Sequence, residues 1–290
     1  MRPSETVICG LFGWPVGHSI SPEIHNAAFA AAGLDWSYRS FPVRPEELPS
    51  AFREFQSRGG RGLNITIPHK VAVIELLDRL EDRARLIGAV NTVLFQDGSA
   101  SGFNTDGPGF IRAVEEEWGF SFSGKSVVLF GAGGAGRAVA VSAVLEGSRL
   151  AITDLDRDRA EGLSGWINRE IRPEAAAVFA ADTASGERVI AAADLAVDAT
   201  PLGLDPSDPP AFDPGLLSPA ASVVDLVYNP PETPLLRAAR RRGLKTLGGL
   251  GMLIHQAALS WTIWTGLPAP IEAMRVAALR AMEERRPEEG

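Results

Sequence analysis

A glycine-rich segment, Gly131-Ala132-Gly133-Gly134-Ala135-Gly136, constrains the fold of this chain more than any other feature. It fits the pattern G-x-G-x-x-G and lies between an apolar segment at 126–130 and a predicted helix at 136–145, with a second apolar segment at 150–153. In such a βαβ unit the first glycine allows a tight turn and the second lets the backbone approach a pyrophosphate. The third lets the helix pack closely on the strand. The spacing therefore predicts a Rossmann-type dinucleotide-binding domain.

The residues after the second strand of this unit bear on the type of dinucleotide. Asp154 stands where a carboxylate would accept hydrogen bonds from the adenine ribose and repel a 2′-phosphate, which favours NAD. Arg157 and Arg159 follow closely and could clamp such a phosphate, which would favour NADP. The same charged residues also suit the start of a helix. The sequence leaves both cofactors open and favours NAD.

Strands and helices alternate along the rest of the chain, which is typical of an α/β fold with a largely parallel sheet. Ser21-Pro22 predicts a helix N-cap followed by proline at the first helical position. A segment rich in proline and aspartate, 203–214, predicts a surface loop. Further strands are expected at 7–12, 36–43, 63–67, 91–95, 176–179, 195–199 and 223–227, and helices at 21–32, 45–57, 71–77, 108–118, 250–265 and 270–282.

Composition limits the class of protein. The chain has 290 residues, of which 45% are hydrophobic and 22% charged, as in an ordinary globular protein. A net charge of −8 argues against a nucleic-acid-binding surface. The single cysteine, Cys9, fits a reducing compartment, and the histidines show no metal-ligand spacing. We therefore expect a cytoplasmic protein with no nucleic-acid partner, no membrane partner and no metal.

Three polar segments in the N-terminal part, 64–70, 88–92 and 102–106, bring together asparagine, threonine, Lys70 and Asp106. Singly, such small polar residues usually form turns or caps. Together they suit a polyhydroxylated ligand, and a lysine with a carboxylate could move the proton of an alcohol while hydride leaves its carbon. The alternative is a surface ion pair of Lys70 and Asp106, which would contribute only about 0–1 kcal/mol to stability.

These segments, in this order, resemble the shikimate dehydrogenase family. The resemblance implies reversible NAD(P)-dependent reduction of 3-dehydroshikimate to shikimate. It also implies two α/β domains with a cleft between them: a substrate-binding domain at 1–105, completed by the C-terminal helices at 246–290, and a Rossmann-type domain at 106–245. The matching segments are 13–22 with His25 and Asn26, 64–70, 88–92, 102–106, 131–135, 198–203, 225–230 and 249–253 with Gln256.

The resemblance also implies roles for individual residues. Lys70 and Asp106 would be the catalytic pair beside the 3-hydroxyl, and which of them transfers the proton stays open. Two serines that precede a helix can both donate to a carboxylate near the positive helix N-terminus. The substrate-binding positions are Ser19 and Ser21 for the carboxylate, and Asn64, Thr66, Asn91, Tyr228 and Gln256 for hydroxyls and orientation. The cofactor-binding positions are Gly131, Ala132, Gly133, Gly134, Ala135, Asp154, Arg159, Thr200, Leu226 and Gly249.

One departure from the family pattern bears on function. NADP-dependent members carry Asn-Arg-Thr after the second strand, where this chain has Asp154-Leu155-Asp156 and keeps only Arg159. That departure is similar to the quinate/shikimate branch, some of whose members prefer NAD, whereas Ser19 and Ser21 resemble the shikimate-selective version. The alternatives are a quinate/shikimate or aminoshikimate dehydrogenase that prefers NAD, and a non-catalytic paralogue that senses shikimate or nucleotide. A small-molecule substrate is the expected partner of a monomer or homodimer.

Overall fold

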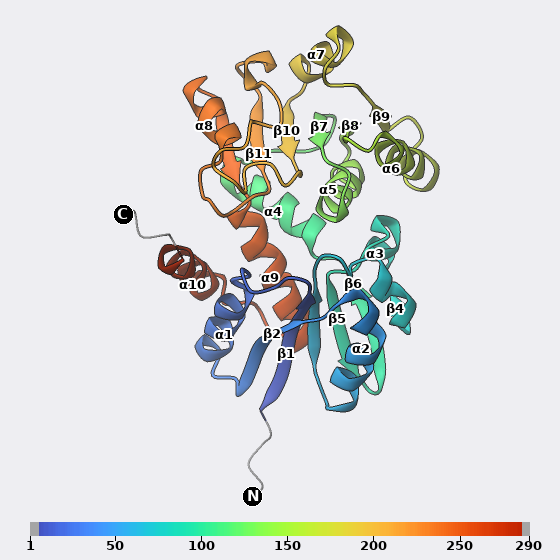
Figure 1. The fold of residues 1–290 in the computed structure, drawn as a ribbon, viewed down its shortest axis with the longest axis vertical. Coiled ribbons are helices and arrows are strands. Elements are labelled where there is room, and N and C mark those ends of the chain that lie inside the picture. Colours follow the sequence, from blue (N-terminus) through green and yellow to red (C-terminus); the bar gives the residue numbers. More distant parts are fainter. Residues whose placement is uncertain (1–5, 286–290) are drawn as a thin grey trace, which may run out of the picture. The chain divides into compact units, whose positions relative to one another are not determined.

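The protein is described by a computed structural model, in which residues 6–285 are placed. The chain divides into two compact units, Met1–Thr105 with Ile254–Gly290, and Asp106–Leu253. The first unit therefore combines the N-terminal third of the chain with its last two helices, and residues 246–253 remain with the second unit. Each unit contains one six-stranded sheet. Figure 1 shows the two sheets with their helices.

The sheet of the first unit is mixed. Its strand order is β2-β1-β3-β5-β6-β4. Strand β1 pairs in parallel with β2 and β3, whereas β5 runs antiparallel to β3 and β6, and β4 is parallel to β6. Three of its five strand pairings are thus parallel, and both antiparallel pairings involve β5. The strands are β1 Val7–Gly13, β2 Trp36–Pro42, β3 Gly62–Ile65, β4 Arg79–Leu80, β5 Thr92–Gln96 and β6 Ser99–Phe103.

A two-residue turn explains why the sheet changes direction. Asp97 and Gly98 both have positive φ, 52° and 76°. A turn of this kind suits a tight hairpin, so the chain returns at once as β6, antiparallel to β5. Strand β6 was not predicted, because the segment 99–103 contains only small residues and one phenylalanine, which is a weak strand signal.

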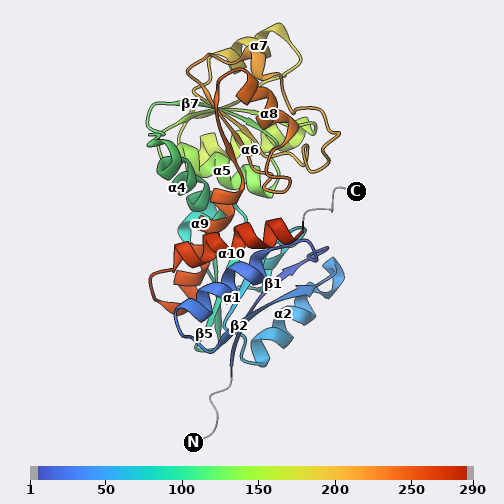
Figure 2. The same ribbon diagram turned by 90° about the vertical axis from the view of Figure 1, so that its left-hand side faces the viewer.

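Different helices cover the two faces of this sheet. On one face Phe52 and Phe55 of α2 join a core with Phe12, Leu63 and Val93 from the strands. On the other face α1 and α10 lie side by side, as Figures 1 and 2 both show. The helical segments of this unit are α1 Ser21–Ala31, the 3₁₀ turn η1 Pro45–Glu47, α2 Leu48–Ser57, the 3₁₀ turn η2 Ala72–Leu76, α3 Asp82–Ile87, most of α9 Leu250–Thr265, and α10 Ile271–Glu284.

Helix α9 is held on the sheet by an aromatic side chain over a glycine. A Cβ atom on Gly62 would lie 2.3 Å from Nε1 of Trp264, so this strand position must lack a side chain. The same indole nitrogen donates a hydrogen bond to the carbonyl of Val93, at 3.0 Å. Trp264 thereby fixes the position of α9 against β3 and β5, which matters for the polar residues one and two turns earlier in the helix.

Two local predictions in this unit are wrong in detail. Ser21 is the first residue of α1 rather than its N-cap, which is Ile20. The hydroxyl of Ser21 accepts a hydrogen bond from that of Ser19. Pro22, predicted at the first helical position, is therefore the second residue of the helix. The segment predicted as a helix at 71–77 forms only the 3₁₀ turn η2.

The sheet of the second unit is entirely parallel, in the order β12-β11-β10-β7-β8-β9. The chain runs outward from β7 in one direction and then, from β10, in the other, so the strand order reverses between β7 and β10. Ligands of such sheets bind at the carboxyl ends of the strands beside this reversal. The strands are β7 Ser126–Phe130, β8 Arg149–Thr153, β9 Ala176–Val178, β10 Leu195–Asp198, β11 Ser222–Asp225 and β12 Lys245–Gly248.

The helices of the second unit follow from local signals. Asp156, Thr183 and Thr233 each cap a helix by accepting a hydrogen bond from the backbone N–H of its third residue. In the predicted surface loop, Phe212 is buried and its ring stacks on Phe130 with centroids 4.4 Å apart. The helical segments are α4 Asp106–Trp118, α5 Gly134–Leu145, α6 Arg157–Glu170, α7 Ala184–Ala191, the 3₁₀ turn η3 Pro214–Leu216, and α8 Pro234–Arg241.

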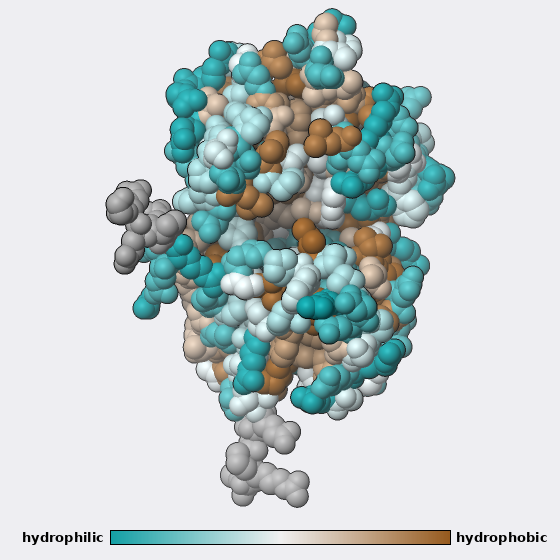
Figure 3. Space-filling view, viewed as in Figure 1, coloured by the Kyte–Doolittle hydropathy of each residue, from teal (hydrophilic) through white to brown (hydrophobic). Residues whose placement is uncertain are grey.

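The surface is mixed in polarity. On the face shown in Figure 3, hydrophilic residues cover much of each unit, and hydrophobic residues occur in small separate groups. Within residues 6–285, no helix has both the length and the apolar character needed to cross a membrane.

Candidate active site

The polar residues predicted to contact substrate in the first unit converge at the ends of β3, β5 and β6. In the sheet register Asn64 lies opposite Thr92, and Thr92 lies opposite Phe103. The three polar segments are thus neighbours because β3, β5 and β6 are adjacent strands. Helix α9 adds Gln256 and Ser260. The buried polar residues of this cluster are Asn64, Asn91, Thr92, Thr105, Gln256 and Ser260.

Asn91 forms one centre of the cluster. Its Oδ1 accepts a hydrogen bond from the backbone N–H of Thr105, at 2.7 Å. Its Nδ2 donates to Oγ1 of Thr105 at 2.9 Å and to Oε1 of Gln256 at 3.3 Å. Because a backbone N–H can only donate, these bonds fix which end of the Asn91 amide is oxygen. The amide of Gln256 is then oriented with its oxygen towards Asn91.

Asn64 forms a second centre. Its Nδ2 donates to the carbonyl of Asn91 at 3.1 Å and to the hydroxyls of Thr92 and Ser260 at 3.2 and 3.0 Å. Its Oδ1 accepts from the hydroxyl of Tyr38, at 2.8 Å. Burial raises the pKa of Tyr38 well above its ordinary value, so this hydroxyl keeps its proton and acts as the donor. The backbone N–H of Thr105, which only donates, orients the Asn91 amide, and the backbone carbonyl of Asn91, which only accepts, orients the Asn64 amide.

Ser19 and Ser21 lie at the start of α1. The hydroxyl of Ser19 donates to that of Ser21 at 3.0 Å, and the backbone N–H of Ser21 donates to Oγ of Ser19 at 3.2 Å. Ser21 is buried and Ser19 half-buried. Two hydroxyls and the positive N-terminal end of an 11-residue helix form a group suited to a carboxylate.

Thr66 and Lys70 lie in the loop that follows β3. The backbone of this loop is fixed by three hydrogen bonds: from N of Thr66 to O of Phe12, from N of His69 to O of Thr66, and from N of Val90 to O of Lys70. The ring of the buried His69 bonds the carbonyl of Val43, at 2.7 Å. Thr66 and Lys70 are both half-buried. The loop therefore holds Lys70 by its backbone beside the segment that carries Asn91.

The two members of the predicted catalytic pair belong to different units. Lys70 is in the first unit, and Asp106 is the first residue of α4 in the second. Asp106 is 6% exposed. Its predecessor, Thr105, is held by the side chain of Asn91, so the chain leaves the polar cluster directly into α4.

The glycine-rich loop of the second unit has the geometry expected of a phosphate-binding turn. Gly131 has φ +93°, and a Cβ there would lie 2.9 Å from the carbonyl of Ala199. A Cβ on Gly136 would lie 2.0 Å from the carbonyl oxygen of Gly131. Gly133, the N-cap of α5, faces open space with no atom within 4 Å of an added Cβ. A phosphate group could therefore approach the backbone most closely at Gly133, directly before Gly134 and Ala135 in the first turn of α5.

Asp154 ties this loop to the start of α6. Its Oδ2 accepts from the backbone N–H of Ala132 at 2.7 Å, and its Oδ1 accepts from that of Asp156 at 2.8 Å. The guanidinium of Arg159 lies 3.6 Å from Asp154 and 3.4 Å from Asp156. The side chain of Asp154 is 9% exposed, whereas that of Arg159 is 54% exposed. A nearly buried, fixed carboxylate thus stands beside the glycine-rich loop.

The remaining predicted cofactor residues lie at the carboxyl ends of β10, β11 and β12. The backbone N–H of Thr200 donates to Asp198, at 2.8 Å. Gly249 packs on the backbone of Leu226, since a Cβ on Gly249 would lie 2.0 Å from the oxygen of Leu226. Tyr228 is half-buried in the loop after β11.

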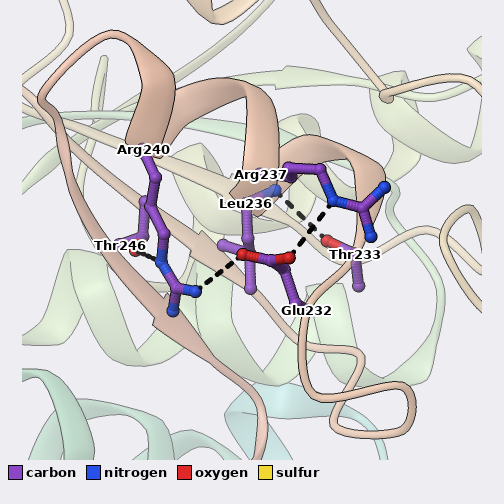
Figure 4. A network of polar contacts seen from close by, with 6 residues as sticks. All are labelled: Glu232, Thr233, Leu236, Arg237, Arg240 and Thr246. Carbon is purple, nitrogen blue, oxygen red and sulfur yellow. Dashed lines mark hydrogen bonds and ion pairs between the residues drawn. The ribbon is translucent and has the colours of Figure 1, made fainter.

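That loop is anchored at its far end by an ionic network (Figure 4). Glu232 pairs with Arg237 at 3.2 Å and with Arg240 at 2.9 Å. Arg240 also donates to Oγ1 of Thr246 in β12, at 2.9 Å. These exposed ion pairs contribute little to overall stability. Their effect is local, because they connect the loop to both α8 and β12.

A pair of buried carboxylates was not predicted as a functional feature. Asp198 and Asp225 end the adjacent strands β10 and β11 and lie opposite each other in the register. Burial raises the pKa of Asp198 to about 7, and the charge of Asp225 adds to the rise. Burial also raises the pKa of Asp225, which accepts a hydrogen bond from Thr233 at 2.6 Å. The only sequence signal was an aspartate at the end of each apolar strand.

The described part of the chain holds no group of three or more His, Cys, Asp or Glu side chains that could bind a metal ion. What the second unit does contain is a doubly wound parallel sheet with a glycine-rich turn after β7 and an acidic residue after β8. Together these features define a two-domain α/β protein with a Rossmann-type dinucleotide-binding domain.

Comparison with known proteins identifies the family. The description "Shikimate dehydrogenase substrate binding domain" matches residues 11–93, and "Shikimate 5′-dehydrogenase C-terminal domain" matches residues 249–279. A protein of Desulforamulus reducens named shikimate dehydrogenase (NADP(+)) is 45% identical over 93% of this chain and 94% of its own length.

Two solved structures are similar over nearly the whole chain. A shikimate dehydrogenase in complex with NADP+ is 38% identical, with a TM-score of 0.90 over 97% of this chain and 98% of that one. The quinate dehydrogenase of Corynebacterium glutamicum in complex with NAD is 39% identical, with a TM-score of 0.88 over 95% and 99%. The chain belongs to the shikimate dehydrogenase family.

Proposed function

We propose that this chain is a shikimate dehydrogenase, which catalyses the reversible NAD(P)-dependent reduction of 3-dehydroshikimate to shikimate. The observation that carries the proposal is the buried polar cluster of the first unit. Its amide and hydroxyl groups are held in fixed orientations by Tyr38, Thr105 and one another. Such a site suits a ligand with several hydroxyl groups, because an analogue that lacks one would leave a buried polar group unpaired. The name of the 45% identical relative supports the same substrate.

We assign the substrate-binding roles as follows. Ser19 and Ser21 bind the carboxylate of the substrate through their hydroxyls and the N-terminus of α1. The side chains of Asn64, Asn91 and Gln256 pair with its ring hydroxyls. Thr66 and Tyr228 complete the orientation of the ring.

Lys70 and Asp106 handle the proton of the 3-hydroxyl. In the direction of oxidation the hydroxyl loses its proton to this pair as hydride leaves the same carbon; in reduction the pair returns the proton to the new alkoxide. A dinucleotide bound to the second unit would supply or take up the hydride at its nicotinamide ring. The ammonium group of Lys70 also stabilises negative charge that develops on the oxygen.

The residues of the second unit fit a dinucleotide. Gly133 leaves the N-terminus of α5 open to a diphosphate, and Thr200, Leu226 and Gly249 lie at strand ends on the same edge of the sheet. The relative from Desulforamulus reducens is named for NADP(+). In this chain, however, Asp154 is a fixed carboxylate at the position that meets the adenosine ribose in Rossmann-type domains.

We infer from Asp154 that the chain accepts NAD more readily than its NADP-dependent relatives do. The two arginines that could bind a 2′-phosphate are already paired with carboxylates, Arg159 with Asp154 and Asp156, and Arg157 with Glu161 at 2.7 Å. A 2′-phosphate would therefore meet a negative charge and would have to compete for both arginines. A 2′-hydroxyl can instead donate to Asp154.

Initial rates with shikimate and quinate, each tested with NAD and NADP, test the proposal. We expect turnover of shikimate to exceed that of quinate, and the ratio of kcat/KM for NAD over NADP to be at least one. A preference for quinate would favour the function of the Corynebacterium relative, a quinate dehydrogenase solved with NAD. Tight binding of shikimate without turnover would instead support a sensor. We further propose that the enzyme acts in the cytoplasm as a monomer or homodimer.

A further inference from the structure

Ser260 occupies the middle of the polar cluster, although no residue of α9 other than Gln256 was expected to take part. Its hydroxyl lies 2.7 Å from that of Thr92 and 3.2 Å from that of Thr105. It accepts a hydrogen bond from Nδ2 of Asn64 at 3.0 Å, and it lies 3.0 Å from the carbonyl of Gln256, one helical turn earlier. The side chain is completely buried.

The single proton of this hydroxyl limits how the cluster can be arranged. The carbonyl of Gln256 can only accept, and Nδ2 of Asn64 can only donate. In one arrangement Ser260 donates to the carbonyl of Gln256, and the hydroxyl of Thr92 donates to Ser260. In the other, Ser260 donates to the hydroxyl of Thr92, which can then donate to Oδ1 of Asn91, 3.2 Å away. In either arrangement the Ser260–Thr92 pair connects Asn64 on β3 with the residues of the β5 edge.

The same hydroxyl connects the helix with the sheet. Gln256 and Ser260 are one turn apart on α9, so the contacts of Ser260 with Asn64 and Thr92 set the height of that turn above β3 and β5. Gln256 in turn accepts a hydrogen bond from Asn91. Asn64, to which we assign a substrate contact, thus bonds this hydroxyl directly. The amide of Asn91 reaches it through Thr92, and the amide of Gln256 reaches it through Asn91.

We propose that Ser260 is a positioning residue of the substrate site, which orients the amides of Asn64, Asn91 and Gln256 for pairing with substrate hydroxyls. The inference rests on the proposed function, because it assigns a role within that site. Removing the hydroxyl would leave the Asn64 amide with one acceptor fewer and Thr92 with one partner fewer. Buried polar groups that lose a partner reorient to find another, so the amides would turn away from the geometry that the substrate requires.

The test compares Ser260→Ala with Thr262→Ala in the full-length enzyme. Thr262 is a matched control, because its hydroxyl makes the same bond to the carbonyl four residues earlier in α9, at 3.0 Å, but lies outside the cluster. For Ser260→Ala we expect the KM for shikimate to rise about three- to tenfold, while the KM for the dinucleotide changes less than about twofold. Thr262→Ala should match wild type in both constants.

Shikimate analogues that each lack one ring hydroxyl give a second measurement. Its result would not change if Ser260 only stabilised the fold. In wild type, loss of a hydroxyl that pairs with the cluster lowers kcat/KM sharply. In Ser260→Ala this penalty should shrink for at least one analogue, because the amides no longer meet the hydroxyl in the right orientation. An unchanged penalty for every analogue would overturn the proposal.

A second variant keeps the test decisive if Ser260→Ala does not fold. Thr92→Val removes the other hydroxyl of the pair and keeps the shape of the side chain, and it should reproduce the rise in KM for shikimate. If both single variants fold, the double variant should be little worse than either one, because the two hydroxyls act together. Kinetics of both variants equal to those of Thr262→Ala would refute the role of Ser260. Wild type without shikimate turnover would refute the proposed function instead.

Discussion

The two units build their candidate sites in opposite ways. In the second unit the site consists mainly of backbone groups in one short segment, where Gly131 and Gly136 shape the turn and Gly133 leaves it open. In the first unit the site consists of side chains from β3, β5, the end of β6 and α9, joined by hydrogen bonds. The difference teaches that a phosphate site can be specified by local sequence, whereas a polyol site needs residues gathered by the fold.

The proposed catalytic pair, Lys70 and Asp106, offers the largest effect. Lys70→Ala should lower kcat by about 10²–10⁴-fold, because the proton of the alcohol would lose its positioned partner. The KM for the dinucleotide should change little. Initial-rate kinetics measure both quantities, with Lys245→Ala as a control at an exposed position of β12. A near-normal kcat would remove Lys70 from the mechanism and leave the first unit as a binding site only.

The buried carboxylates of the second unit give a pH-dependent effect. Because the pKa of Asp198 is about 7 in the fold against an ordinary 3.8, the protonated form is the one the fold favours. The contribution of the protonated Asp198 carboxyl to the free energy of unfolding is therefore fully present below about pH 4, and it is lost as the pH rises through about 7. Asp198→Asn cannot ionise, so it should be more stable than wild type at pH 8, by a few kcal/mol, and the gain should shrink towards pH 4.

Urea unfolding across that pH range measures the gain. Asp182→Asn, at an exposed position, serves as the control and should show no such trend. A gain that is the same at pH 4 and pH 8 would mean that the ionisation of Asp198 is not the cause.

Glycine substitutions test how far the second site depends on its backbone. Gly136→Ala should destabilise the unit by about 1–3 kcal/mol, because its Cβ would lie 2.0 Å from the oxygen of Gly131. Gly162→Ala, within α6 and with no atom within 4 Å of the added Cβ, should instead stabilise by about 0.5–1 kcal/mol. Free energies of unfolding give both values. Equal effects of the two substitutions would contradict the role assigned to the turn.

The smallest predicted effect concerns cofactor choice. Asp154→Asn removes the negative charge beside the glycine-rich loop and should shift the ratio of kcat/KM for NADP over NAD upward by about tenfold. Any general loss of stability affects both cofactors alike and cancels in the ratio. Asp158→Asn, an exposed residue in the first turn of α6, is the control. An unchanged ratio would show that Asp154 acts only through its hydrogen bonds to Ala132 and Asp156.

The contrast between the units also explains what the sequence could predict. Strand β7, the glycine-rich turn and α5 were found almost to the residue, because each carries its own local signal. The hairpin strand β6 was missed because small residues give a weak strand pattern, and β12 was missed as well. Both segments form strands because they pair with neighbouring strands of the sheet, and their own sequences give little indication of it.

The site residues also differ in how well the sequence predicts them. Asn64, Asn91 and Gln256 were predicted as substrate contacts, and in the structure they belong to one hydrogen-bonded cluster. Ser260 and Tyr38 could not be found, because one lies in an apolar helix and the other in a strand with no motif around it. Their role depends on the register of β3 with β5 and on the packing of Trp264 over Gly62. No short segment of sequence encodes either.

The most direct test of the proposed function follows the hydride itself. Shikimate that carries deuterium at C3 should transfer the label to the nicotinamide ring, and mass spectrometry should find unlabelled 3-dehydroshikimate as the product. That result would establish the reaction and the carbon at which it occurs. Retention of the label in unchanged shikimate, in the presence of a bound dinucleotide, would contradict the assignment of this chain as a shikimate dehydrogenase.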